Sequence, residues 1–108
     1  MSEAVWSVIK YKPKKGCEDE FKNVGLKRLA EFMNRPDKNV TWSIIELGTG
    51  EIVQLTRNES IDAIIDAQVG GVEWLDSVDH LLEKDKEGSR TQAYSGLEMD
   101  FTHSFQTC

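Results

Sequence analysis

The side chains best suited to proton chemistry lie near the C-terminal end of the chain. Glu98 and Asp100 are two positions apart, so their carboxylates would share one face of a β-strand. Paired carboxylates can raise the pKa of one member and so create a general acid or base. His103 follows closely, and its imidazole titrates near neutrality. Glu98 and His103 are therefore candidate catalytic bases. The alternatives are an acidic pair on a solvated edge or dimer interface, and a tail or interface histidine.

Two other reactive side chains give weaker indications. Cys17 would lie at the start of a helix, where the helix dipole favours a thiolate, but three acidic neighbours oppose this. The plainer interpretation of Cys17 is an inert thiol, and that of His80 is an exposed residue on the polar side of a helix. Since His80 and His103 have no cysteine or carboxylate at ligand spacing, the sequence gives no zinc or iron signal, and we expect no metal site.

The composition fits one small domain, residues 1–108. The chain has 108 residues, of which 39 % are hydrophobic and 30 % are charged, and its formal net charge is −6. An acidic chain without a basic face is not typical of nucleic-acid binding or of binding to anionic membranes. No apolar run is long enough to span a membrane, and the N-terminal residues lack a signal-peptide pattern. The expected compartment is the cytoplasm, where Cys17 and Cys108 would stay reduced.

Hydrophobic periodicity predicts the element order β-α-β-β-α-β. The strands are expected at residues 4–12, 40–47, 51–57 and 91–103, and the first helix at residues 16–35. Gly25 would allow that helix to pack closely on the sheet. The second helix would begin near Ser60, a natural N-cap. Its two apolar stripes, before and after Gly70 and Gly71, are out of phase, which predicts a break or kink at these glycines.

Right-handed crossovers turn this order into an α+β fold, the ferredoxin-like sandwich. Its four-stranded antiparallel sheet would have the order 4-1-3-2, with both helices on one face. Strand alternation assigns to the helix-covered face Val5, Ile9, Ile45, Leu47, Val53, Leu55, Leu97, Met99 and Phe101. It assigns to the opposite face Trp6, Val8, Lys10, Trp42, Ile44, Glu46, Gln54, Glu98 and Asp100. Because an open apolar patch is rarely left to water, we expect a homodimer that packs two such faces together.

The face without helices also offers the best candidate for a small-molecule site. Trp6 and Trp42 would form apolar walls, and Gln54 and Glu98 would supply polar anchors, which is the combination that a ligand site needs. Near the rim of this site would lie Trp74 and Tyr94. The expected ligand is a small apolar or aromatic molecule. The alternative is that these residues only fill the core of the dimer.

Three sequence features carry a resemblance to a known family. They are the element order, the entry into the first helix through Pro13, Gly16, the acidic residues 18–20 and Phe21, and the presence of Trp74 in the second helix. Together they resemble the antibiotic-biosynthesis monooxygenase (ABM) type of dimeric α/β barrel. That superfamily includes cofactor-independent oxygenases of polycyclic quinols, heme-degrading enzymes, dismutases and ligand domains of regulators.

The residues do not match the heme-degrading branch. That branch uses an Asn in strand 1 and a His ten residues after the helical Trp, whereas His80 follows Trp74 by six residues and the tenth position is Lys84. The resemblance instead implies a cofactor-independent monooxygenase of small aromatic or quinol-type metabolites, in which a deprotonated substrate reacts with dioxygen in a dry pocket. The alternative is a non-enzymatic ligand-binding or structural dimerisation module.

Overall fold

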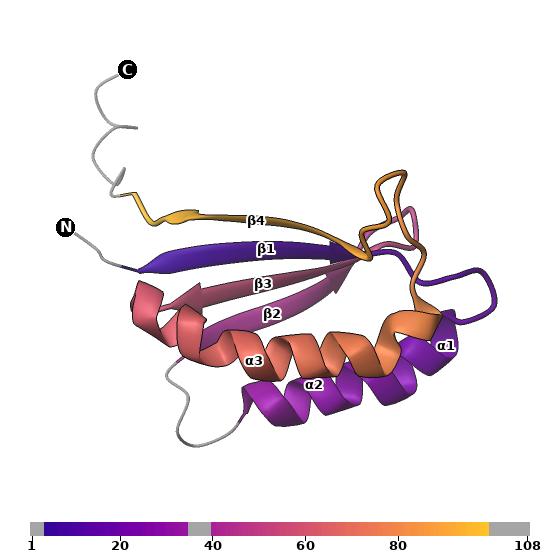
Figure 1. The fold of residues 1–108 in the computed structure, drawn as a ribbon, viewed down its shortest axis with the longest axis horizontal. Helices are drawn as coiled ribbons and strands as arrows, with labels where there is room; N and C mark the ends of the chain where they lie inside the picture. Colours follow the sequence, from indigo (N-terminus) through magenta and orange to yellow (C-terminus); the bar gives the residue numbers. More distant parts are fainter. Residues whose placement is uncertain (1–3, 35–39, 100–108) are drawn as a thin grey trace.

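The computed structural model describes residues 4–34 and 40–99, and its centre is one antiparallel sheet. The strands are β1 (Val5–Tyr11), β2 (Val40–Glu46), β3 (Ile52–Asn58) and β4 (Thr91–Leu97). Their order across the sheet is β2-β3-β1-β4 (Figure 1). This order is the predicted 4-1-3-2 read from the other edge, so the structure confirms the α+β ferredoxin-like sandwich.

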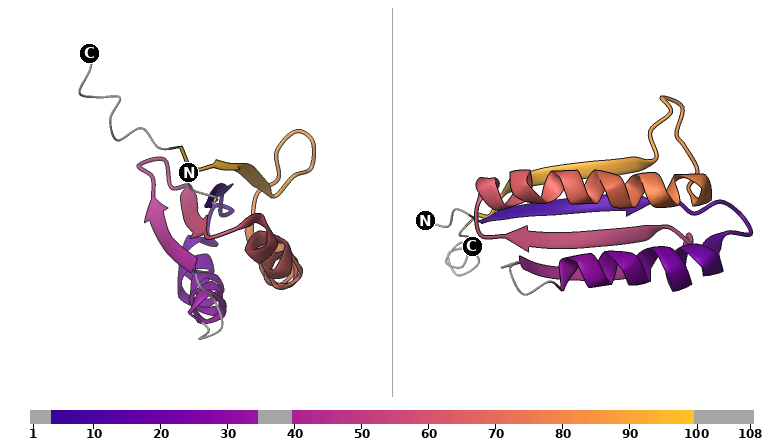
Figure 2. Two further views of the ribbon diagram at one scale, coloured as in Figure 1. Left: turned by 90° about the vertical axis from the view of Figure 1, so that its left-hand side faces the viewer. Right: turned by 60° about the horizontal axis from the view of Figure 1, so that its bottom comes forward.

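Two helical stretches cover one face of the sheet, as predicted (Figure 2). The first is continuous and consists of α1 (Glu18–Glu20), the π turn η1 (Phe21–Gly25) and α2 (Leu26–Met33). The second consists of α3 (Ile61–Val78) and the 3-10 turn η2 (Asp79–Leu81). The Ser60 hydroxyl caps α3 by accepting from the N–H of Ala63 at 3.3 Å, which confirms the predicted N-cap. Within the described residues, no helix has both the length and the apolarity to cross a membrane.

The predicted break at Gly70 and Gly71 is wrong, because α3 runs through both glycines without interruption. The second apolar stripe of this helix is buried, whereas Ile61, Ile65 and Val72 of the first are more than half exposed. Gly70 has a packing role instead. A Cβ at this position would lie 2.4 Å from the ring of Phe32, so the glycine lets α2 and α3 approach closely.

The π turn η1 changes which residues of the first helix face inward. The N–H of Leu26 bonds to the carbonyl of Phe21, five residues back, and so shifts the helical register. For this reason Val24, which an α-helical pattern places on the apolar face, is 43 % exposed. Gly25 faces Val78 of α3, where a Cβ would lie 3.0 Å from Cγ1. It therefore serves the contact between the helices and not, as predicted, a contact with the sheet.

The apolar core lies in the layer between the sheet and the helices. Tyr11 stacks edge-on against Trp74, with ring centroids 5.5 Å apart and an interplanar angle of 80°. The buried cluster comprises Tyr11, Phe21, Leu29, Met33, Ile52, Trp74, Val78, Leu81 and Leu82.

The register of the sheet corrects the predicted faces of two strands. Thr56 lies opposite Ser7 on one side and Trp42 on the other, and Trp42 and Ile44 pack against the core under the helices. The face without helices therefore carries Ile45, Val53 and Leu55, the reverse of the prediction, whereas the prediction for β1 has the right phase. Both β2 and β3 have apolar residues at adjacent positions, so alternation alone does not fix which side is buried.

Candidate functional site

Three polar side chains of β3 form a buried row on the face that the helices cover. Gln54, Thr56 and Asn58 occupy alternate positions of the strand and are only 6 %, 6 % and 8 % exposed. They follow Ile52 of the core cluster along β3, towards the end of the strand that leads into α3. Burying polar groups is costly unless they are hydrogen-bonded, so a row of this kind in a central strand indicates a function beyond packing.

The row is connected to the core by hydrogen bonds that run in one direction. The hydroxyl of Tyr11 donates to Oε1 of Gln54 at 2.6 Å. The amide of Gln54 then donates from Nε2 to Oγ1 of Thr56 at 3.3 Å. Burial raises the pKa of Tyr11 well above its ordinary value, because an apolar environment disfavours the phenolate. Tyr11 therefore remains a protonated donor at the start of this relay.

Thr56 also belongs to a row of residues that crosses all four strands. Ser95 of β4, Ser7 of β1, Thr56 and Trp42 of β2 are successive neighbours. Directly opposed side chains in such a sheet are about 5 Å apart. The hydroxyls of Ser7 and Ser95 are 3.3 Å apart, and the indole of Trp42 donates to Oδ1 of Asn34 at 3.3 Å. The arrangement makes Trp42 the cross-strand neighbour of Thr56.

Asn58 ends the buried row with an amide available for binding. Its side chain makes no hydrogen bond to another residue in the part of the chain that the structure describes. In that same part, every fully enclosed side-chain nitrogen or oxygen has a hydrogen-bond partner. Because the amide of Asn58 has none, its polar atoms must reach accessible space, even though only 8 % of the residue is exposed. An amide can offer both donors and an acceptor to a ligand.

The chemistry of this row is recognition by hydrogen bonds. Its hydroxyl and amide groups can bind carbonyl, hydroxyl or oxyanion groups of a ligand, and Trp42 can contact an apolar ring. The row Gln54, Thr56 and Asn58 contains no carboxylate or imidazole. A search of the described residues for three or more clustered His, Cys, Asp or Glu side chains finds no candidate metal site.

The site residues predicted from the sequence lie on two opposite sides of the sheet. Trp42, Gln54 and Trp74 lie on the helix side, where the indole of Trp74 donates to the carbonyl of Gly25 at 2.7 Å. Sequence reasoning missed Thr56 and Asn58 as members of the site. The available signal was the alternation of three polar residues in a strand flanked by apolar ones.

The remaining predicted residues gather on the face without helices. Glu98, just after β4, accepts from Arg57 Nε at 2.9 Å and Nη2 at 3.1 Å, and from the indole of Trp6 at 2.9 Å. Tyr94 lies on the same face and is 68 % exposed. The prediction that Trp6 and Trp42 line one pocket is therefore wrong, because these residues are on opposite faces. Asp100 and His103 lie outside the described residues, and the predicted role of Glu98 as a base stays a prediction.

A separate groove of about 250 Å³ lies at the far end of the sheet, but most of its charged side chains already form ion pairs. Lys10 contacts Glu51 at 3.2 Å, and Lys12 contacts Glu83 at 3.3 Å. Arg90 bonds to two carboxylates of the second helical stretch. We regard this groove as ordinary charged surface.

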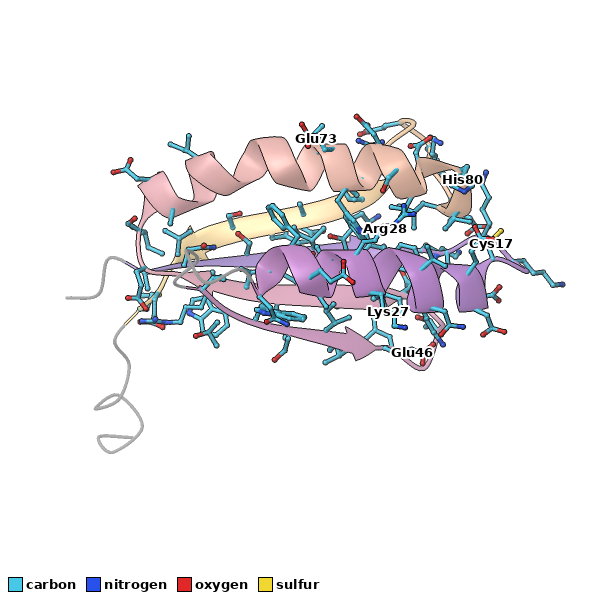
Figure 3. The ribbon with its side chains drawn as sticks, turned by 90° about the horizontal axis from the view of Figure 1, so that it is seen from below. Cys17, Lys27, Arg28, Glu46, Glu73 and His80 are labelled. Carbon is cyan, nitrogen blue, oxygen red and sulfur yellow. The ribbon has the colours of Figure 1, made fainter. Side chains whose placement is uncertain are left out.

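Cys17 and His80 lie at one end of the helical layer (Figure 3). His80 is exposed, and its Nε2 is 3.6 Å from a carboxylate oxygen of Glu20. Cys17 is a free, partly exposed thiol. The exposure of His80 agrees with its plainer interpretation, and the inertness of the Cys17 thiol stays a prediction.

Comparisons place the fold among known proteins. No protein-family model matches the sequence, and no curated protein matches it significantly. A conserved protein from Methanosarcina mazei Go1 has a TM-score of 0.74 and 15% identity, over 89% of this chain and 93% of that one. SnoaB, a cofactor-independent oxygenase from Streptomyces nogalater, has a TM-score of 0.73 and 15% identity, over 94% of this chain and 99% of that one. A candidate antibiotic biosynthesis monooxygenase from Nitrosomonas europaea has a TM-score of 0.73 and 8% identity, over 93% of this chain and 94% of that one.

These neighbours define the structural class of the chain. It has the ferredoxin-like fold of ABM-type proteins, aligned over most of its length and most of theirs. The sequence resemblance to that superfamily is therefore confirmed at the level of the fold. One fold of this kind supports many activities, so function has to be argued from the site.

Proposed function

We propose that the chain binds a small aromatic metabolite between the sheet and the helices and oxygenates it without a cofactor. The observation that carries this proposal is the buried row of Gln54, Thr56 and Asn58, in which Thr56 has Trp42 as a cross-strand neighbour. Hydrogen-bonding groups that are shielded from water can bind a phenolic ligand and stabilise its anion. The fold shared with the oxygenase SnoaB supports the reaction class.

The reaction fits a site that offers hydrogen bonds in place of a strong base. A phenolic substrate releases its proton, and the negative charge spreads to a ring CH carbon conjugated with the phenolate oxygen. That carbon gives an electron pair to dioxygen, forms a C–O bond and becomes a hydroperoxide after protonation. Loss of the remaining C–H proton and cleavage of the O–O bond then yield a C=O group and water. The substrate supplies all four electrons, so no further reductant is needed.

Oxygen consumption tests this function directly. We expect the protein to accelerate oxygen uptake by a panel of quinols and anthrone-type phenols above their uncatalysed rates, with the rate unchanged after treatment with a chelator. Asn58→Ala and Trp42→Ala should reduce the acceleration, whereas Thr41→Val, an exposed change on the other face of β2, should not. Ligand binding without oxygen uptake would contradict the enzyme and favour a binding protein.

We further propose that the face without helices is the contact surface of a homodimer. Its apolar side chains include Trp6, Ile45 and Tyr94, which are 38 %, 45 % and 68 % exposed. Such a patch favours burial against a second copy. Ile45→Lys should convert a dimer into monomers in light scattering, whereas Ile61→Lys, at an exposed position of α3, should leave the mass unchanged. A monomeric wild-type protein would contradict the proposal.

A further inference from the structure

The hydrogen bonds that begin at Tyr11 have a fixed direction, and this direction limits what the site can bind. Tyr11 is the donor at the buried end, so Gln54 presents Oε1 to Tyr11 and Nε2 to Thr56. The side-chain oxygen of Thr56 is consequently an acceptor towards Gln54. A hydroxyl has a single proton, and that proton is left to point away from the relay.

The proton of Thr56 has no acceptor among the described residues. The side chain makes the bond with Gln54 and no other to a described residue, and Thr56 is 6 % exposed. Its neighbours across the strands are Ser7 and Trp42. A buried donor without an acceptor is costly, and a bound ligand with an acceptor atom would remove this cost.

We infer that Thr56 is a specificity residue that selects ligands carrying a carbonyl or oxyanion acceptor over ligands that present an N–H or a C–H at the same place. This inference rests on the proposed site and adds the polarity of the group it recognises. Tyr11 is a positioning residue in this arrangement, because it acts on the ligand only by orienting Gln54.

Three probes of nearly identical tricyclic shape can test the polarity. Fluorenone presents a carbonyl acceptor, carbazole presents an N–H donor at the corresponding position, and fluorene presents neither. We expect the wild-type protein to bind fluorenone about threefold to tenfold more tightly than fluorene, the value of one ordinary hydrogen bond, and carbazole no better than fluorene. The carbonyl stretch of bound fluorenone should shift to lower frequency, as it does on accepting a hydrogen bond.

Matched variants separate the hydroxyl from the shape of the side chain. Thr56→Val should abolish the preference and the infrared shift, and Thr56→Ser should keep both. Tyr11→Phe should weaken the preference, because Gln54 can then rotate and accept the proton of Thr56. Thr41→Val, on the other face of β2, is the control and should change neither property.

The outcomes distinguish this inference from the proposed function. Equal binding of the three probes, or tightest binding of carbazole, would overturn the inferred polarity while leaving a ligand site in place. Failure of all three probes to bind at their solubility limit would count against the binding site itself and hence against both proposals. Loss of the preference in Thr56→Ser would show that the methyl group, and not the hydroxyl, is responsible.

Discussion

The indole nitrogen of Trp74 donates to the main-chain carbonyl of Gly25 over 2.7 Å, and this bond ties α3 to the π turn of the other helical stretch. Trp74 is 7 % exposed and touches Tyr11 and Phe21 through its ring. One side chain therefore joins both helical stretches and the sheet. The polar row of β3 starts next to this junction, because Tyr11 is also the donor to Gln54.

Removing the indole donor should be costly. Trp74→Phe removes the indole donor to the buried carbonyl of Gly25, which is the N-cap of α2 and keeps its helical bond, and we expect a loss of about 1 kcal/mol in the free energy of unfolding. Trp6→Phe breaks a more exposed bond to Glu98 and should cost less. Urea denaturation of both variants at one protein concentration measures the difference. Equal losses of stability would show that the buried bond of Trp74 stabilises the fold no more than the exposed bond of Trp6 does.

The two adjacent glycines of α3 should respond in opposite directions to alanine. Nothing lies near a Cβ placed on Gly71, so Gly71→Ala should raise stability by about 0.5–1 kcal/mol through helix propensity. Gly70→Ala should lower it by about 1 kcal/mol, because the Phe32 ring must move. Thermal unfolding measures both. In a Phe32→Ala background Gly70→Ala should become stabilising; continued destabilisation there would rule out the ring as the cause.

The bond between Tyr11 and Gln54 should show strong coupling in stability. Gln54→Leu leaves a buried hydroxyl unpartnered and should cost about 1–3 kcal/mol, whereas adding Tyr11→Phe removes both polar partners. We therefore expect the double variant to be more stable than the sum of the single changes predicts. Denaturant unfolding of the four proteins completes the cycle, and additive losses would refute the coupling.

Acid should weaken the contact between the loop before β4 and the end of the second helical stretch. The hydrogen bond from Lys84, and then that from Arg90, lowers the pKa of Asp79 below its ordinary value. A lowered folded-state pKa stabilises the fold above the unfolded pKa of about 3.9, and this contribution is lost as the pH falls through the folded value.

Asp79→Asn should therefore flatten the fall in melting temperature below about pH 4. Lys84→Met should have a similar effect, because Lys84 is the leading cause of the lowered pKa. Calorimetry from pH 6 to pH 3 compares the three proteins. A carbon-detected NMR titration that finds the Asp79 pKa at or above its ordinary value would contradict this account.

The sequence permits prediction of the order of elements but not of every buried face. The β1 alternation was predictable because Val5, Ile9 and Tyr11 lie on one side. In β2, Ile44 and Ile45 are adjacent and both apolar, so only the observed pairing shows that Ile44 faces the helices. The alternation of β3 places Gln54 on the face without helices, whereas the structure places it under the helices. The buried row of Gln54, Thr56 and Asn58 could therefore not be predicted.

The first helix shows a second limit. Its apolar spacing was evaluated with the α-helical period, and that period holds only outside η1. The continuity of α3 could not be predicted for a related reason. In sequence a glycine pair is typical of a helix end, and nothing in the sequence shows that Gly70 instead makes room for the ring of Phe32 on another helix. Both errors arise from contacts between segments that are distant in the chain.

The π turn at Phe21–Gly25 also bears on how relatives of this chain should be recognised. A π turn accommodates one residue more than the α turn it replaces, so a homologue with a regular helix would have one residue fewer between Phe21 and Leu26. A gapless alignment would then place every later position of the helix about 100° out of phase. Searches that permit a single-residue deletion within 21–25 should align the inward-facing residues of both proteins.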